Sequence, residues 1–183
     1  NIFYGHDLVA TMKAADANAQ RSTVFAYHVK DPQRYGVVAF DAQGRATSIE
    51  EKPAVPRSNY AVTGLYFYGS DVCDVAAQVR PSARGELEIT SINQHYLAQG
   101  QLDVQTLGRG FAWLDTGTHD SLLEAGQYIH TIEQRQGQKV ASPGEVSWRN
   151  RWIDDAQLLA LAAPLSKSQY GAYLADLVKE GGR

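Results

Sequence analysis

The sequence of 183 residues contains only one cysteine, Cys73. A single thiol excludes an internal disulfide and a zinc site built from several cysteines. We therefore expect a reducing compartment such as the cytoplasm. We also expect Cys73 to be packed on a helix.

Long hydrophobic runs are missing as well. No stretch approaches the roughly 18 consecutive apolar residues of a transmembrane helix, and the N-terminus lacks the charged, apolar and small-residue zones of a secretory signal. The chain begins at Asn1 without a methionine, and its first residues, NIFYG, are apolar in the manner of a strand end. We therefore expect that a segment upstream of Asn1 has been removed.

The sequence has no excess of positive charge. Seventeen Lys and Arg residues stand against twenty Asp and Glu residues, which gives a net charge of -3. Surfaces that collect nucleic-acid phosphates are strongly basic. The composition therefore argues against a nucleic-acid-binding protein, and any anion site must be a local pocket.

Several familiar motifs are also absent. The sequence contains no Walker A loop, no GxGxxG and no nucleophile elbow. His119 and His130 would lie roughly 16 Å apart on one helix, which is too far for one metal ion. Glu50 and Glu51 are adjacent strand residues that point to opposite faces, which argues against a glycosidase carboxylate pair.

The patterns that are present alternate between strand and helix. Helical spacing predicts helices over 6–20, 70–79, 86–99 and about 118–136, and short β-branched or alternating runs predict strands over 22–29, 35–41, 46–51, 59–69, 102–107 and 111–114. From residue 142 the patterns SPGE, DDAQ and SKSQ match helix N-caps and predict three short helices. This order predicts an α/β fold around a mixed sheet, with residues 1–137 as the main domain and 138–183 as a helical appendage.

The segment 59–69 is the strongest strand pattern. Its period of two places one set of side chains on a common face: Tyr60, Val62, Gly64, Tyr66 and Tyr68. Such an aromatic face is either the wall of a ligand pocket or simply part of the core.

Asp115 ends an apolar strand and is followed by Thr116, Gly117 and Thr118. Strand ends of this kind are where α/β sheets present groups to ligands, and magnesium favours one or two carboxylates together with phosphate oxygens. The alternative is that Asp115 merely caps the helix that follows. The pattern alone leaves both interpretations open.

Four segments carry a family resemblance: EEKP at 50–53, NYAVTGLYFY at 59–68, ARGELEIT at 83–90 and AWLDTGT at 112–118. In this order and spacing they resemble the sugar-phosphate half of the glucose-1-phosphate thymidylyltransferases. The resemblance implies a Rossmann-like nucleotidyltransferase fold, N-terminally incomplete, and an enzyme that forms dTDP-glucose and pyrophosphate from dTTP and glucose 1-phosphate. The family's glycine-rich phosphate loop has no counterpart here, so we expect this chain alone to be inactive.

The resemblance also implies roles for individual residues. The substrate-binding positions are Tyr35, Gly36, Glu51, Lys52, Val62, Tyr66, Arg84 and Trp113. Among these, Glu51 would bind glucose hydroxyls, and Lys52 and Arg84 would bind phosphate. Asp115 would hold Mg2+, and the partner carboxylate would fall just upstream of Asn1. Without the resemblance, EEKP also fits a solvated strand end, and a lone loop arginine is usually a surface residue.

A second site is implied by the same resemblance. It would bind dTDP-rhamnose, the end product of the pathway that supplies polysaccharide biosynthesis, through Tyr4, Gly5, Arg109, Glu145 and Arg149. The family's homotetramer makes a homo-oligomer the expected assembly. Glu145 is equally explained as the glutamate of a capping box in SPGE. Two other functions stay open: a noncatalytic nucleotide-binding or assembly domain, and a pyrophosphorylase for another base or sugar.

Overall fold

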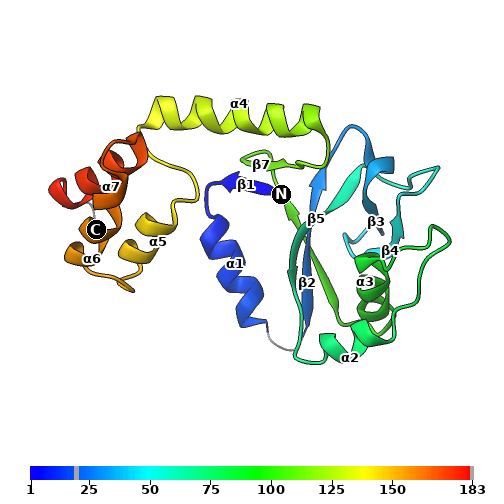
Figure 1. The fold of residues 1–183 in the computed structure, drawn as a ribbon. Coiled ribbons are helices and arrows are strands. Elements are labelled where there is room, and N and C mark those ends of the chain that lie inside the picture. The colour runs from blue at the N-terminus through cyan, green and yellow to red at the C-terminus, as the bar shows by residue number, and fades with distance from the viewer. Residues whose placement is uncertain (19–20, 182–183) are drawn as a thin grey trace. The chain divides into compact units, whose positions relative to one another are not determined.

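The computed structural model describes residues 1–18 and 21–181. The chain forms two compact units, Asn1–Gly117 and Thr118–Arg183, whose helices and strands are drawn in Figure 1. Each unit has its own hydrophobic core. The division between them falls at the start of α4 (His119–Gln136). The predicted domain boundary after residue 137 lies at the other end of that helix, where Gly137 caps it.

The first unit is built on a mixed five-stranded sheet with the order β4-β3-β5-β2-β6. Its strands are β2 (Ser22–His28), β3 (Gly36–Phe40), β4 (Ala46–Glu51), β5 (Tyr60–Phe67) and β6 (Leu102–Leu107). The β2–β6 pair is parallel and the other neighbours are antiparallel. A separate antiparallel ribbon joins β1 (Ile2–Gly5) to β7 (Phe111–Leu114). The predicted α/β class with a mixed sheet is confirmed.

The two faces of β5 pack in different cores, as its alternation predicted. Val62 lies in one core with Ile92 and Tyr96 of α3 (Ile89–Ala98). Leu65 packs on the other side against the cluster of Ala15, Phe25 and Leu107. The strand therefore presents one of its faces to α3, and the pocket described below opens on that face.

The helices of the first unit are shorter than predicted. α1 spans Leu8–Ala17 and α2 spans Val72–Ala77, and the predicted extension of α1 to residues 19–20 lies outside the described residues. α3 begins at Ile89 rather than at residue 86, because the carbonyl of Glu86 accepts a hydrogen bond from Ser82 N and the carboxylate of Glu88 accepts one from the Ser82 hydroxyl. Those bonds hold the preceding loop in a non-helical conformation.

Cys73 lies on α2, but its side chain is exposed. The prediction of a packed cysteine was therefore wrong, because the buried residue of this helix is Val75.

The second unit contains α4 followed by the three predicted short helices, α5 (Pro143–Arg149), α6 (Asp155–Ala162) and α7 (Gln169–Lys179), with the short 3-10 helix η2 (Ala163–Leu165) after α6. Ser142 and Asp154 cap α5 and α6 as predicted. The cap of α7 is Ser168 rather than Ser166, the first serine of SKSQ.

None of the described helices has both the length and the apolar character that a membrane crossing requires.

Candidate active site

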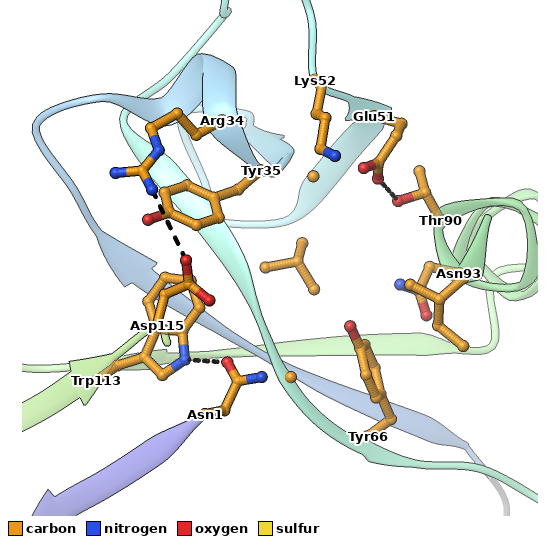
Figure 2. Close-up of a pocket in the computed structure, with 14 residues that line it drawn as sticks. Asn1, Arg34, Tyr35, Glu51, Lys52, Tyr66, Thr90, Asn93, Trp113 and Asp115 are labelled. Atoms are coloured by element: carbon orange, nitrogen blue, oxygen red, sulfur yellow. Dashed lines mark hydrogen bonds and ion pairs between the residues drawn. The ribbon is translucent and has the colours of Figure 1, made fainter. Parts of the chain in front are cut away.

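Most of the predicted substrate residues line a single pocket in the first unit (Figure 2). Its volume is about 190 Å³. The walls come from the start of β3, the end of β4, the α3-facing side of β5, the first turns of α3 and the end of β7. The lining residues are Asn1, Arg34, Tyr35, Gly36, Glu51, Lys52, Val62, Gly64, Tyr66, Ile89, Thr90, Asn93, Trp113 and Asp115.

Glu51 forms the polar wall at the end of β4. Its Oε2 accepts a hydrogen bond from the hydroxyl of Thr90 on α3. Gly36 faces this pair, and a Cβ at that position would lie 3.1 Å from Thr90 Oγ1 and 3.4 Å from Glu51 Oε2. A side chain at this position would therefore crowd the Thr90–Glu51 pair, which glycine leaves undisturbed. The neighbouring Glu50 is paired instead with Arg57 at 3.1 Å.

Lys52 follows Glu51 in a left-handed backbone conformation with φ of 41°. A non-glycine residue seldom adopts such a conformation, and here the Lys52 N–H donates to the carbonyl of Tyr35 at 3.0 Å. Figure 2 shows the ammonium group directed into the pocket. Among the described residues no carboxylate lies within ion-pair distance of it, so it is available to an anion.

The β5 wall carries Val62, Gly64 and Tyr66, as the alternation predicted. A Cβ on Gly64 would lie 2.5 Å from Nδ2 of Asn1, so the space left by this glycine holds the Asn1 side chain. Asn1 is held in turn by Trp113, whose Nε1–H donates to Asn1 Oδ1 at 2.7 Å. Trp113 is therefore a buried support of this wall.

Asp115 lies at the end of β7, and its carboxylate is 3.8 Å from the guanidinium of Arg34. The helix that follows is capped by Thr118, whose hydroxyl accepts from Ser121 N and completes a capping box with Ser121. The alternative that Asp115 serves as the cap is therefore wrong, and its carboxylate faces the pocket.

A magnesium ion would find one carboxylate at this position. No group of three or more His, Cys, Asp or Glu side chains suited to a metal occurs in the described part of the chain. Asp115 lines the pocket, and one carboxylate with phosphate oxygens and waters is a normal magnesium shell. The residues present therefore fit a metal that binds together with a phosphate ligand.

Two tyrosines of the pocket stay neutral at physiological pH. Burial raises the pKa of Tyr35, and the nearby Arg34 partly offsets the rise. Burial also raises the pKa of Tyr66, and the negative charge of Glu51 adds to it. Their phenols can therefore serve as hydrogen-bond donors in the pocket.

Arg84 is the one predicted substrate residue that does not line the pocket. Its guanidinium lies 2.7 Å from Glu86, 3.6 Å from Glu88 and 3.9 Å from Glu51. Three carboxylates therefore compete for this cation, and its predicted role toward phosphate stays a prediction.

The structure adds pocket residues that the sequence patterns did not single out. These are Asn1, Arg34, Ile89, Thr90 and Asn93. Thr90 and Asn93 are buried polar residues three positions apart on α3. Two polar side chains on the buried face of a helix would indicate a binding site. The sequence alone does not show which face of α3 is buried, so this signal could not be used.

The predicted regulatory residues fall in both units. Tyr4, Gly5 and Arg109 belong to the first, and Glu145 and Arg149 to the second. Within the second unit, the Glu145 carboxylate accepts hydrogen bonds from Arg149 Nε at 2.7 Å and from the hydroxyl of Tyr173.

The alternative reading of Glu145 as a capping-box residue fits in part. Its backbone N–H donates to the capping hydroxyl of Ser142. The role of the five residues toward a nucleotide stays a prediction.

Comparison with known proteins decides the family. The family pattern described as "Nucleotidyl transferase" matches residues 1–132. The chain belongs to the nucleotidyl transferase family.

Curated relatives have a more specific name. The glucose-1-phosphate thymidylyltransferase of Xanthomonas campestris is 56% identical to this chain over 99% of its length, and that of Mycobacterium tuberculosis is 54% identical over 98%. The chain spans 61% and 62% of the lengths of these two relatives.

Solved structures support the same fold. A Bacillus anthracis protein described as a glucose-1-phosphate thymidylyltransferase, crystallised with sucrose, matches with a TM-score of 0.59 at 38% identity, over 69% of this chain and 50% of that one. A UDP-glucose pyrophosphorylase complexed with UDP-glucose gives a TM-score of 0.62 at 20% identity, over 71% and 53%. The second match shows the fold alone.

Proposed function

We propose that this chain is the sugar-phosphate-binding part of an enzyme that forms dTDP-glucose and pyrophosphate from dTTP and glucose 1-phosphate. The observation that carries the proposal is one pocket that combines the carboxylate of Glu51, the ammonium of Lys52 and the carboxylate of Asp115. The names of the curated relatives support the same activity.

The pocket residues divide the work of holding the sugar phosphate. The Glu51 carboxylate accepts hydrogen bonds from sugar hydroxyls, and Lys52 neutralises phosphate charge. Val62 and Trp113 pack against the apolar face of the ring. The bound phosphate oxygen then forms a new bond to the α-phosphorus of dTTP while the bond from that phosphorus to the pyrophosphate oxygen breaks, so no covalent enzyme intermediate is required.

Asp115 would hold Mg2+, which neutralises phosphate charge when it is bound. The ion pair with Arg34 keeps the Asp115 carboxylate at the pocket edge. The ion pair between Arg34 and Asp115 would have to weaken when a metal and a phosphate bind together.

The test is a two-substrate assay with the complete natural chain of the protein. With magnesium, dTTP and glucose 1-phosphate, we expect dTDP-glucose and pyrophosphate in equal amounts, and loss of both when EDTA is added. Replacing dTTP by UTP, and glucose 1-phosphate by galactose 1-phosphate, separates this activity from that of a pyrophosphorylase for another base or sugar. Product formed only with those replacements would contradict the proposal.

A noncatalytic nucleotide-binding role has one structural observation in its favour. Tyr27, His28, Tyr60 and Arg109 line a second pocket of about 420 Å³, and aromatic walls beside an arginine suit a base and its phosphates. Calorimetry with dTDP-rhamnose and glucose 1-phosphate separates the two roles. Tight binding of the first without the second would favour regulation over catalysis.

The homo-oligomer is likewise a proposal, which sedimentation of the complete chain would check.

A further inference from the structure

Asn93 is a buried polar residue in the wall of the sugar-phosphate pocket. It lies on α3 and is fully shielded from solvent, at 0% exposure. Its Nδ2 has no hydrogen-bond partner among the described residues. The side chain nevertheless lines the pocket, so a donor that lacks a partner within the protein borders the space where a ligand would bind.

The direction of this donor is fixed by Tyr68. The Tyr68 hydroxyl donates to Asn93 Oδ1 at 2.6 Å, so the amide oxygen is occupied and the NH₂ group turns the other way. Burial raises the pKa of Tyr68, which keeps this phenol protonated and able to donate. Stacking on Tyr66 and Tyr96, with ring centroids 5.8 and 5.7 Å away, holds the Tyr68 ring in place.

Figure 2 shows the Asn93 nitrogen directed toward the interior of the pocket. A buried N–H without a partner is costly to leave unpaired. An apolar ligand would not satisfy it, but a ligand oxygen would. The pocket therefore selects for a ligand that places an oxygen at this wall.

The same helix supports a complementary group. Thr90, three residues before Asn93 on α3, donates to Glu51, and Glu51 is an acceptor. Residues three apart lie on one face of a helix. This face of α3 thus directs one donor, Asn93, to the pocket and holds one acceptor, Glu51, in place. A donor and an acceptor together can bind hydroxyl groups, which both accept and donate hydrogen bonds.

We propose that Asn93 Nδ2 donates a hydrogen bond to one hydroxyl oxygen of the bound sugar, and that this bond helps decide which hexose phosphate the enzyme accepts. The inference depends on the proposed function, because it assigns the residue a role toward that sugar phosphate. It makes Asn93 a specificity residue and not only a support for the Tyr68 ring.

The test pairs protein variants with sugar variants in the complete natural chain. The kcat/KM is measured for glucose 1-phosphate and for the analogues that each lack one hydroxyl. For the wild-type protein we expect the analogue that lacks the Asn93 partner to lose about 10-fold. In Asn93→Leu, a side chain of similar size that can neither donate to nor accept from a hydroxyl, that particular loss should shrink to less than about 2-fold.

A matched control comes from Thr63, another fully buried residue whose hydroxyl has no partner among the described residues. It is not among the residues that line this pocket, so Thr63→Val should leave the ranking of the analogues as in the wild type. Asn93→Ala serves as a second variant if Asn93→Leu fails to fold, and the same analogue-specific change is expected.

Two results would overturn the inference, and they are distinguishable. If both Asn93 variants lower kcat/KM by one common factor for every analogue, the residue is a structural support only. If the wild-type protein itself neither turns over nor binds glucose 1-phosphate, the proposed function fails first, and the assignment of Asn93 to its sugar fails with it.

Discussion

At the scale of single residues, the neighbours Glu50 and Glu51 show how one strand separates two chemically identical groups. Glu51 points to the pocket and is held by Thr90, whereas Glu50 is partly exposed and paired with Arg57. The two residues therefore form an internal control for the proposed recognition of the sugar.

Glu51→Gln is expected to lower kcat/KM for glucose 1-phosphate by about 10- to 100-fold, because hydrogen bonds to a charged acceptor are stronger than those to a neutral one. Steady-state kinetics with the complete chain measures this change. Glu50→Gln should stay within about 2-fold of the wild type, since an exposed ion pair contributes little. Equal effects of the two substitutions would show that Glu51 does not bind the sugar.

Residue-scale features differ in how far the sequence could predict them. The face that carries Val62 and Tyr66 followed from strand alternation alone, and Glu51, Lys52 and Asp115 came from the family resemblance. Asn93 was not predicted, because a polar residue within a helix gives no signal until the strand opposite it is known. Arg84 was placed toward a phosphate, but nothing in the local sequence showed that three carboxylates would surround it.

At the scale of elements, capping and turn signals predicted the existence of the helices more reliably than their first residues. The caps Ser142 and Asp154 were correctly located. The start of α3 was not, because Glu86 and Glu88, which precede the helix, bond to Ser82 in the loop. A competing hydrogen bond from outside the element is not visible in a periodic pattern.

Two helical glycines are expected to respond in opposite directions to the same substitution. In Gly171→Ala, near the start of α7, the new Cβ would lie 2.1 Å from the backbone oxygen of Leu165, so we expect a loss of stability of about 1–3 kcal/mol. In Gly126→Ala, within α4, the new Cβ would meet no described atom within 4 Å apart from its chain neighbours and the backbone of its own helix, and we expect a gain of about 0.5–1 kcal/mol.

Denaturant unfolding of both variants, followed by circular dichroism, measures these changes. The pair controls for the chemistry of the substitution, because both replace a helical glycine by alanine. A neutral Gly171→Ala would show that the η2 segment moves aside without cost.

At the scale of the whole molecule, the two units keep separate cores. Trp148, Leu158 and Leu174 form the core of the second unit. The cores of the first unit contain Val24, Val38 and Phe25 among others. A substitution that destabilises one core should therefore leave the stability of the other unit unchanged.

Leu174→Ala tests this separation. Leu174 is 1% exposed, and removing such a side chain costs about 2–5 kcal/mol. Hydrogen exchange followed by mass spectrometry should show faster exchange in α5, α6 and α7, with β2 and β5 unchanged. Faster exchange in both units would show that they unfold as one.

The general architecture was predictable at this scale, since alternating strands and helices favour an α/β fold. The division into units was harder to predict. α4 follows the sheet directly in the sequence, and only packing assigns it to the second unit.

The β1–β7 ribbon has a consequence for the order of events during synthesis. Asn1 is among the first residues described here, yet its place in the pocket depends on Trp113, which the ribosome adds more than a hundred residues later. A nascent chain that already contains Glu51 and Lys52 still lacks this wall. We therefore expect a ligand of the complete pocket to stabilise the protein only after β7 has emerged.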